Sequence, residues 1–208
     1  MAFDNSFTAV VGATYTAAQY NTHVRDNFTA VWVYTAAGDI AYATSATALA
    51  RLAKGTAYQT LRMNSGATAP EWGGAIVGKA VRAANQTVND STLTAAIFMS
   101  AEISHSLVSW SAGSPTRLNI ELTGKYMLGA SYAIDGGAGY REAGIYKNSA
   151  EILPSRIDNA AGETTYLPFG GSSFSLSAGD YLEVFVKHNA GGAINLRAAS
   201  LSAAFVGV

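Results

Sequence analysis

The residues that could support acid–base or metal chemistry are few and scattered. Histidine occurs at His23, His105 and His188, and no two of these have the spacing of paired metal ligands on a helix. The HExxH pattern of a zinc protease is absent. We therefore predict no metal site and interpret each histidine as an ordinary surface or interface residue.

The fourteen carboxylates raise one enzymatic hypothesis. Glu142 with Glu151, or Asp135 with Glu142, could converge as the carboxylate pair of a glycosidase. Such pairs also arise by chance, and other signatures are missing: there is no GxSxG, and GGAG at 136–139 lacks the Lys-Ser/Thr of a phosphate loop. The chain has no cysteine, which excludes thiol chemistry and disulfides. We predict no catalytic residue, no cofactor and no enzyme activity.

Two glycine-rich segments carry residues suited to binding. DGGAGYR places Asp135, Tyr140 and Arg141 around flexible glycines, and HNAGG carries Asn189 in a similar setting. Aromatic rings with short polar neighbours suit carbohydrate or protein surfaces. We predict that these four residues bind a receptor; the alternative is that both segments are simple connecting loops.

The segments that must position these loops have the pattern of strands. From 76 to 208, short alternating stretches such as RLNIEL (117–122) and YLEVFVK (181–187) recur, separated by Gly, Asn, Asp and Ser. NAGG at 189–192 is predicted to be a hairpin loop, and SAGD at 177–180 to link another strand pair. With about nine or ten strands and no long helical pattern, this part is predicted to be an antiparallel sandwich.

One of these strands is apolar on both faces. Leu182, Val184 and Val186 share one face, and Tyr181 and Phe185 share the other. The second face therefore also needs cover, which predicts a trimer axis; the alternative is that these are ordinary core aromatics. The aromatic residues predicted at the trimer interface are Tyr126, Tyr132, Tyr181, Phe185 and Phe205.

Residues 14–33 are predicted to form a helix. Thr16 and Gln19 fit a capping box. One apolar stripe follows, which we interpret as an anchor, and it consists of Tyr20, Val24, Phe28 and Val31. The partner of this stripe is left open between the chain's own domain, a neighbouring copy and a larger assembly.

The segment 38–72 contains few large apolar residues. TALARLAKG is expected to form two helical turns ending at Gly55, TLRM a short strand, and NSGATAPEW a turn that ends at a large aromatic residue. Within one chain, these residues bury too little area to offset about 1–2 kcal/mol of ordering cost per residue. Three copies around one axis could share a narrow core, so a thin trimeric shaft is predicted. Its interface residues are Leu49, Leu52 and Leu61.

The composition limits the classes of partner. Charged residues make up 13% of the chain, against roughly 25% in a typical soluble domain, so a surface buried against other subunits is expected. The net charge of −1 gives no basic field for nucleic acid or an anionic membrane. No apolar run approaches a membrane span of about eighteen residues. The N-terminus lacks the pattern of a secretory signal, so synthesis in a cytoplasm without self-export is expected.

Two parts of the chain resemble known families. The segment 38–72, through GDIAYA, ALARLAKG, LRMNSG and TAPEW, resembles a spacer of tailed-bacteriophage fibre and other virion proteins, and TAAQYNTHVRDNF resembles their leader helix. The last 130 residues or so resemble the trimeric jelly roll of complement globular heads and tumour-necrosis-factor-like ligands, through 123–134, 174–186 and SLSAAFVGV. This second resemblance implies that the interface aromatics lie in one sheet. Without cysteine or a calcium-ligand cluster, ligand identity does not carry over.

These patterns predict a mainly β chain in three parts. An N-terminal segment with a helix (1–37) anchors a thin extended trimeric shaft (38–75), which carries an antiparallel jelly-roll β-sandwich (76–208). The expected function is that of a homotrimeric phage fibre on the outer surface of the virion. It is anchored to tail or capsid proteins and attaches to a host-surface glycan or protein, without nucleic acid or membrane insertion. The alternatives are a capsid head fibre or decoration protein and a glycan-cleaving tailspike.

Overall fold

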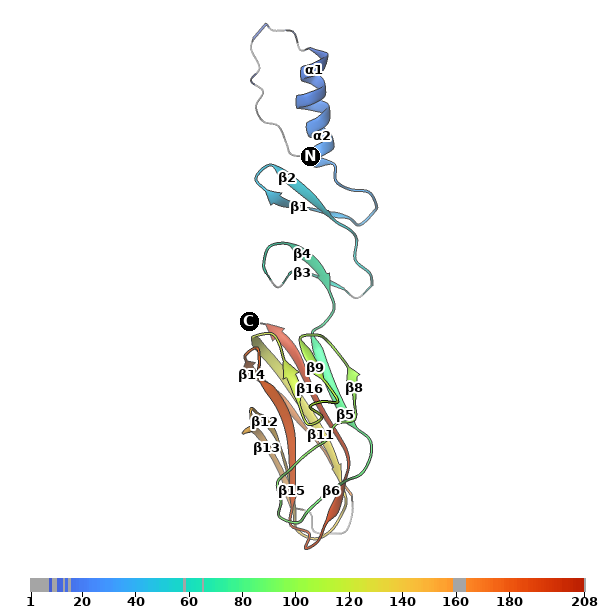
Figure 1. The fold of residues 1–208 in the computed structure, drawn as a ribbon, viewed down its shortest axis with the longest axis vertical. Helices are drawn as coiled ribbons and strands as arrows, with labels where there is room; N and C mark the ends of the chain where they lie inside the picture. Colours follow the sequence, from blue (N-terminus) through green and yellow to red (C-terminus); the bar gives the residue numbers. More distant parts are fainter. Residues whose placement is uncertain are drawn as a thin grey trace. The chain divides into compact units, whose positions relative to one another are not determined.

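The structure is a computed structural model that describes residues 8, 11–12, 14, 16–57, 59–64, 66–158 and 164–207. Parts of the predicted anchoring segment, including 1–7, lie outside these residues. The chain divides into two compact units, Met1–Ala75 and Ile76–Val208. Figure 1 shows that the first unit contains the helix and two small hairpins, and the second a β-sandwich. Among the described residues, no helix has the length and apolar character needed to cross a membrane.

The first unit begins with the predicted helix. It comprises α1 (Ala17–Tyr20), a π-helical turn η1 (Asn21–Arg25) and α2 (Asp26–Val31). The capping box is present, since the Gln19 amide donates to Thr16 Oγ1 at 3.2 Å and the Thr16 amide donates to Gln19 Oε1 at 3.0 Å. The prediction of a capped helix is therefore confirmed over its described residues.

Two hairpins complete the first unit. β1 (Ile40–Ser45) pairs with β2 (Ala48–Leu52), and β3 (Thr60–Met63) pairs with β4 (Pro70–Gly73), both antiparallel. The strand expected at TLRM is confirmed as β3. The helical turns expected in TALARLAKG are wrong, because those residues contain β2.

Asp39 connects the segments at which the chain enters and leaves the β1–β2 hairpin. Its carboxylate accepts hydrogen bonds from the amides of Thr35 at 2.8 Å and Lys54 at 3.1 Å, and from Arg51 Nε at 2.7 Å. The Arg51 guanidinium is the main reason that the pKa of Asp39 lies well below its ordinary value. One side chain thus holds together the two strand ends opposite the turn of the hairpin, and this contact depends on partners twelve and fifteen residues away in sequence.

Gly55 permits a close approach between the two hairpins instead of capping a helix. A side chain at Gly55 would collide with the ring of Trp72, at 2.7 Å. The Trp72 indole N–H in turn donates to the carbonyl of Ala53 at 2.7 Å. The large aromatic at the end of NSGATAPEW therefore holds the second hairpin against the end of the first.

The second unit is a sandwich of two antiparallel sheets. The first, called here the β15 sheet, has the order β13-β12-β15-β10-β9 with β7 on β15. The second, called the β16 sheet, has the order β14-β11-β16-β5-β8 with β6 on β16. The strands are β5 (Val77–Arg82), β6 (Gln86–Val88), β7 (Thr94–Ala95), β8 (Ser100–Ile103), β9 (Val108–Trp110), β10 (Leu118–Ile120), β11 (Gly124–Ile134), β12 (Tyr140–Lys147), β13 (Ala150–Asp158), β14 (Thr165–Leu176), β15 (Tyr181–His188) and β16 (Ile194–Gly207).

The chain crosses repeatedly between the two sheets, which is the jelly-roll arrangement. β14 and β16 lie in the β16 sheet, whereas β15 between them lies in the other sheet. The hairpin loop predicted at 189–192 is therefore wrong, because this segment connects strands of different sheets. The segment 177–180 links two strands, as predicted, and these are β14 and β15 of different sheets. A hairpin does join β12 to β13, through Asn148 and Ser149, which both have positive φ as a tight two-residue turn requires. The fold class, a mainly β chain with an N-terminal helix and a jelly-roll sandwich, is confirmed.

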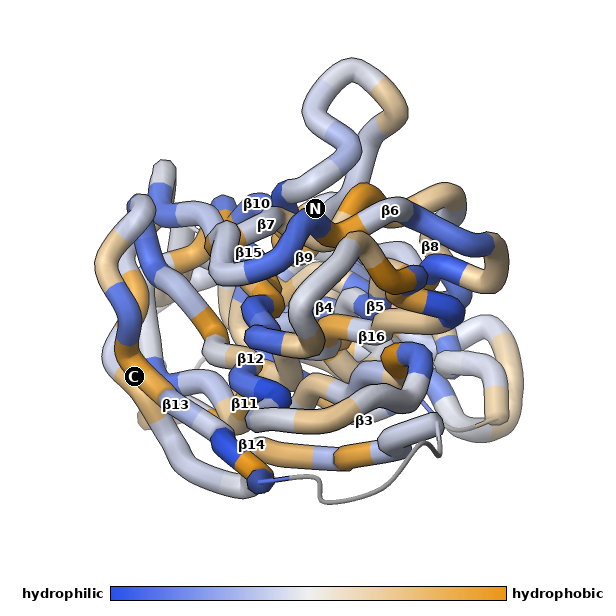
Figure 2. The backbone as a smooth tube through the Cα atoms, turned by 90° about the horizontal axis from the view of Figure 1, so that it is seen from below, coloured by the Kyte–Doolittle hydropathy of each residue, from blue (hydrophilic) through white to orange (hydrophobic). Residues whose placement is uncertain are grey.

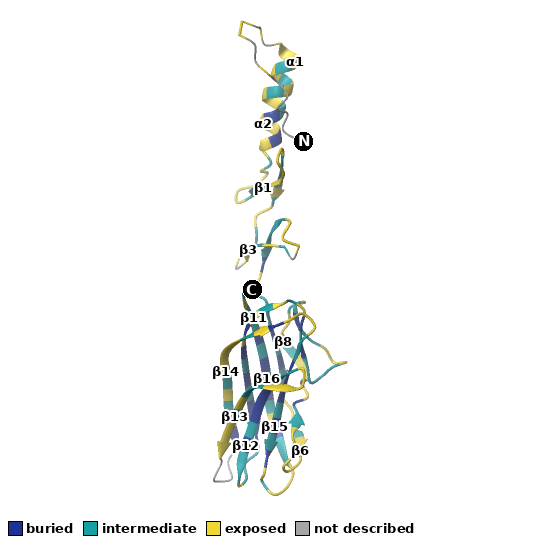
Figure 3. Ribbon diagram, turned by 90° about the vertical axis from the view of Figure 1, so that its left-hand side faces the viewer, coloured by how far each residue is buried: buried dark blue, intermediate teal, exposed yellow. Residues whose placement is uncertain are grey.

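The core lies between the sheets and follows the predicted alternation. Leu182, Val184 and Val186 on β15 are fully buried, and so are Leu118 and Ile120 on β10. Figure 2 shows hydrophobic and hydrophilic residues interleaved along the strands, and Figure 3 shows the buried residues concentrated in the sandwich. A strand that alternates in this way buries one face in the core, and its other face is exposed unless a further surface covers it.

Candidate binding surface at the loop end of the sandwich

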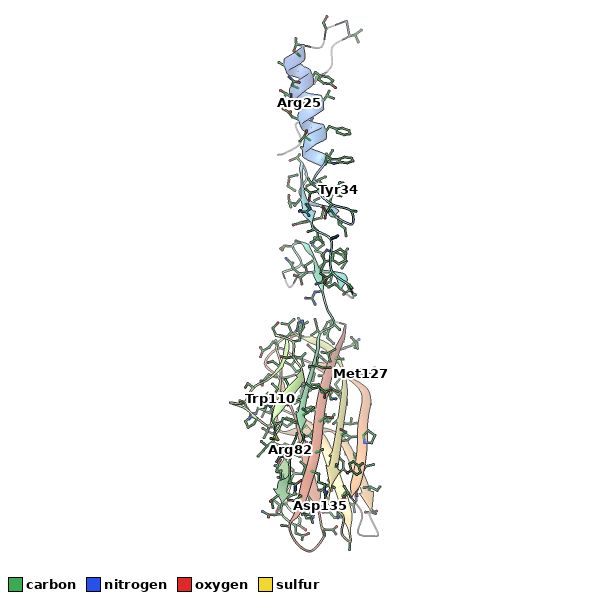
Figure 4. The ribbon with its side chains drawn as sticks, turned by 90° about the vertical axis from the view of Figure 1, so that its right-hand side faces the viewer. Arg25, Tyr34, Arg82, Trp110, Met127 and Asp135 are labelled. Atoms are coloured by element: carbon green, nitrogen blue, oxygen red, sulfur yellow. The ribbon has the colours of Figure 1, made fainter. Side chains whose placement is uncertain are left out.

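Three connections meet at one end of the sandwich. They are the segments 135–139, 189–193 and 89–93, which join β11 to β12, β15 to β16 and β6 to β7 respectively. The chain enters this unit at the other end, where the Ile76 carbonyl accepts a hydrogen bond from Phe205 near the end of β16. Figure 4 shows Asp135 at the loop end. The three connections are called the loop end below.

Asp135 ties the first of these connections to β16. Its backbone amide donates to the Asn195 carbonyl at 2.8 Å, and its carboxylate accepts from Asn195 Nδ2 at 3.0 Å and pairs with Arg197. The hydrogen bond from Arg197 is the first cause of the lowered pKa of Asp135, and Asn195 adds to it. The carboxylate is thus held in its charged form and in a fixed position.

Arg141 lies beneath the same loop and is 0% exposed. Its guanidinium donates to the carbonyls of Asp135 at 3.2 Å, Gly137 at 3.2 Å and Tyr140 at 3.0 Å. Burial lowers the pKa of Arg141. The prediction that Arg141 contacts a receptor is corrected, because its buried fork of donors is used to satisfy the loop's own backbone.

Asn189 joins the second connection to the first. Its Oδ1 accepts a hydrogen bond from the Tyr140 amide at 2.6 Å. Gly139, with φ of 89°, lies so close to Asn189 that any side chain there would collide with it. The Tyr140 ring is covered on one side by the Arg156 guanidinium, 4.3 Å from the ring centre. Asp135, Tyr140 and Asn189 are therefore brought together, as the binding prediction requires.

His188 connects the third segment to the other two. It is fully buried, with Nε2 2.9 Å from the Val88 carbonyl, while Nδ1 accepts from the Ala190 amide at 3.2 Å. Asp90 Oδ1 lies 3.6 Å from Nδ1 and accepts from the Gly191 amide at 2.9 Å. The interpretation of His188 as a surface or interface residue is wrong, because the ring holds two loops together from inside.

The loop end is thus a cross-linked frame that presents small groups to solvent. Asn189, Gly191, Gly192 and Ala138 are exposed, and Leu93 adds an exposed apolar side chain. Within the described ranges, no cluster of three or more His, Asp or Glu side chains could hold a metal ion. The chemistry available here is hydrogen bonding from amides and carbonyls, with one partly covered aromatic ring. Such groups suit recognition of a polar surface.

The two glutamates of the glycosidase hypothesis lie away from the loop end. Glu142 and Glu151 are on the outer face of the β15 sheet, where both help to raise the pKa of Tyr146, after burial as the first cause. Asp135 is engaged by Arg197 and Asn195 at the loop end. Nothing in the hydrogen bonding of the described residues joins these groups to one another.

The aromatic residues predicted at the trimer axis lie in two sheets. Tyr126 and Tyr132 on β11 are 0% and 2% exposed within one chain, so they are core residues unavailable to another copy. Phe205 lies on β16 and packs edge-on against Tyr126 at 5.4 Å. Tyr181 and Phe185 lie on β15, in the other sheet, so the expectation of one shared sheet is wrong.

The outer face of the β16 sheet shows a feature that the sequence interpretation missed. Along β11 and β16, cross-strand pairs of small or uncharged residues point outward, because their neighbours in sequence fill the core. These pairs are Met127 with Ala204, Gly129 with Ser202, Ser131 with Ser200, and Ala133 with Ala198. In the sequence, this row of small outward residues corresponds to the alternation in GASYA and SLSAAF. It can be recognised only once the residues that point into the core are known.

A shallow depression of about 430 Å³ lies on this outer face. Its lining includes Gly129, Pro168, Gly170 and Ser202, and it follows a register shift in the pairing of β11 with β14. Gly170 has φ of 134°, and a side chain there would meet the Leu128 carbonyl at 2.5 Å. The depression is therefore built into the backbone and not left by a chance side-chain position.

The residues that complete the loop end were also missed from sequence. Asp90, Asn195 and Arg197 come from segments far from DGGAGYR, and no local pattern distinguishes them. Their role follows only from the strand order, which brings β6, β12 and the start of β16 to one end.

Comparison with known proteins identifies no family for the chain. No protein-family description matches the sequence, and no curated protein matches it. Two solved structures of murine APRIL, of the tumour-necrosis-factor family, are similar to the chain. The structure at pH 5.0 has a TM-score of 0.48 and 9% identity, and covers 62% of this chain and 99% of that chain. The structure at pH 8.0 has a TM-score of 0.49 and 12% identity, and covers 62% and 98%.

Proposed function

We propose that this chain is a structural virion protein of a tailed bacteriophage, a homotrimeric fibre whose jelly-roll head attaches the particle to a host-surface glycan or protein. The resemblance of residues 38–72 to the spacer of phage fibre proteins supports the virion assignment. The same proposal places the protein on the outer surface of the particle, after synthesis in the host cytoplasm.

The observation that carries the assembly is the outer face of the β16 sheet. Its outward residues from Met127 to Ala133 and from Ala198 to Ala204 include no charge. Small side chains allow close approach of another surface, and a subunit contact lacks charged residues at its centre. We therefore assign the trimer contact of the head to this face, in place of the contact predicted at Tyr181 and Phe185.

The attachment role is assigned to the loop end. It lies at the end of the sandwich opposite Ile76, where the chain enters, and its backbone carbonyl and amide groups are fixed by Arg141 and His188. A fixed frame loses little conformational freedom on binding, which favours affinity. Three copies raise the apparent affinity of a weak site by orders of magnitude.

The attachment of the fibre to the particle is assigned to the helix. Its apolar stripe is exposed at Tyr20, Val24, Phe28 and Val31 and lies away from the buried residue Ala30. An exposed apolar stripe of this kind marks an interaction site. Tail or capsid proteins are the proposed partners of its N-terminal half.

The test uses the purified full-length protein on host cells. We expect it to bind these cells, to block phage adsorption and to release no fragments from host-surface glycans. Replacing Asp135 and Tyr140 together by Ala should weaken cell binding at least tenfold without changing the trimer mass. Fragment release would instead support a tailspike enzyme. A trimer located on the capsid that binds no cells would support a decoration protein.

A further inference from the structure

One exposed aromatic ring lies near the start of β14. Among the aromatic residues described in the second unit, Tyr166 alone is exposed, with 70% of its surface accessible to solvent. Tyr166 pairs across strands with Ala133, an outward residue of β11 close to the segment 135–139. The ring therefore lies on the outer face of the β16 sheet, at its border with the loop end, where a ligand can reach it.

A β-bulge in β16 places Arg197 at the same border. Leu196 and Ala198 pair with consecutive residues of β11, so Arg197 between them is an extra residue without a partner on that strand. Bulges redirect a side chain and are frequent next to functional sites. The hydrogen bond to Asp135 is the main reason that the pKa of Arg197 is raised, and Tyr166 adds a smaller electrostatic contribution. Arg197 thus pairs with Asp135 within electrostatic reach of the exposed ring.

Two further side chains complete a hydrogen-bonded set beside the ring. The Asp135 carboxylate pairs with Arg197 and accepts a hydrogen bond from Asn195 Nδ2 at 3.0 Å. The side chains of Arg197 and Asp135 are 54% and 20% exposed, so the pair can form further hydrogen bonds with a ligand. The ring and the three planar polar side chains are called here the Tyr166 patch, which consists of Tyr166, Asp135, Asn195 and Arg197.

The chemistry of the Tyr166 patch fits a sugar. A pyranose has an apolar C–H face that packs on an aromatic ring, and its adjacent hydroxyl groups both donate and accept hydrogen bonds. The patch offers carboxylate acceptors and guanidinium donors, and their mutual bonds hold them in place before a ligand arrives. A protein ligand is normally held by several aromatic or apolar anchors close together. In this patch a single ring is accompanied by polar groups, which favours a sugar.

We propose that the Tyr166 patch binds one pyranose unit of a host-surface glycan, with the sugar's C–H face on the ring and its hydroxyl groups bonded to Asp135 and Arg197. This inference rests on the attachment role proposed above and names the ligand class. None of the four residues belongs to the outward rows 127–133 and 198–204 that were assigned to the subunit contact. Assembly of the trimer therefore does not require burial of the patch.

The first test compares binding of the full-length natural protein to host cells that are untreated, oxidised with periodate or digested with protease. Periodate cleaves the vicinal diols of sugars, so we expect it to weaken binding by about tenfold or more. This result would support the inference whether or not protease also removes the receptor. Binding that survives periodate would overturn the sugar ligand and leave the attachment role in place. Absence of binding to untreated cells would overturn both.

The second test uses two matched substitutions at one position. Tyr166→Phe keeps the ring and should retain cell binding within about threefold, whereas Tyr166→Leu keeps apolar bulk without a ring and should lose about tenfold or more. Native mass and melting temperature are measured on the same samples and should not change. Equal binding by the two variants would overturn the stacking role of Tyr166. A lower native mass of Tyr166→Leu would assign Tyr166 to the subunit contact and likewise overturn the inference.

Discussion

The two outer faces of the sandwich differ in how they satisfy their own side chains. On the β15 sheet, Tyr146 packs against Phe185 at 4.6 Å, and Arg117 lies 3.9 Å from the centre of the Tyr181 ring. Glu183 accepts a hydrogen bond from Thr116 at 2.7 Å. These rings and charges are matched to one another within the face.

The centre of the outer face of the β16 sheet, along β11 and β16, has no comparable network of rings and charges among its described residues. Ser131 and Ser200 share a hydrogen bond of 2.8 Å, Ser202 Oγ donates to the Gly129 carbonyl at 3.1 Å, and the other outward residues there are Gly, Ala and Met. Charges lie beside this centre, where Lys79 on β5 pairs with Glu102 on β8 at 2.7 Å. A surface exposed to water normally carries charged side chains. The outward residues of β11 and β16 carry none, so hydration stabilises this face little. This difference shows that aromatic content alone does not identify a subunit contact. The uncharged face, whose central side chains have few partners within the chain, is the better candidate.

The largest expected effect comes from placing a charge on the β16 sheet face. Ser200→Glu should dissociate the trimer at micromolar concentration, because a buried carboxylate without a partner costs several kcal/mol. Native mass measurement gives the result directly. A Ser200→Glu variant that remains trimeric would remove this face from the contact.

The matched substitution on the other face should leave the assembly intact. Phe185→Glu removes the ring contact with Tyr146 and is expected to lower the free energy of unfolding by about 1–3 kcal/mol, with an unchanged trimer mass. Thermal unfolding and native mass are measured on the same sample. Dissociation of the Phe185→Glu trimer would instead assign the subunit contact to the outer face of the β15 sheet, as predicted from Tyr181 and Phe185.

The loop end should respond separately from both faces. Arg141→Met leaves several loop carbonyls without their donor and should cost about 2–4 kcal/mol of unfolding free energy, with weaker cell binding and an unchanged mass. Arg197→Met, which breaks a more exposed ion pair with Asp135, is the control and should cost less than about 1 kcal/mol. Equal losses for the two variants would show that Arg141 does not hold the loop.

The smallest expected effect comes from acid acting on Asp135 at the loop end. Because the folded pKa of Asp135 lies below its ordinary value of about 3.9, its stabilisation is complete above that pH and is lost as the pH falls through the folded pKa. The difference in melting temperature between the natural protein and Asp135→Asn should therefore shrink below about pH 4. The trimer mass should hold between pH 7 and pH 4, since the outward residues from Met127 to Ala133 and from Ala198 to Ala204 include no titratable group. A constant difference in melting temperature would contradict this role of Asp135.

Local patterns predicted the parts of the fold that local forces determine. The capping box at Thr16 and the alternation around Leu182 are encoded within a few residues, and both are confirmed. The hairpin loop predicted at 189–192 instead joins two different sheets, because a turn segment contains no information on whether the next strand joins the same sheet. Which sheet the next strand joins depends on how the whole chain buries its apolar residues.

The candidate site was predictable to a similar degree. DGGAGYR and Asn189 were recognised as loops that could bind, and Asp135, Tyr140 and Asn189 do converge. Arg141 is predicted to be at the surface, because a cationic side chain is normally exposed. Its burial is stable only because several backbone carbonyls surround the guanidinium and accept its hydrogen bonds. The position of these carbonyls depends on the path of the backbone and not on residue type.

The pairing of β5 with β16 also sets a schedule for making the protein. β5 ends at Arg82, and its partner begins at Ile194, roughly 110 residues later, so at about 5–20 residues per second the ribosome needs about 6–22 s to supply it. During this interval the nascent β5 lacks the neighbour that fills the middle of its sheet. The head can close only when the last strand has left the ribosome, whereas both hairpins of the first unit are complete before synthesis of the head begins.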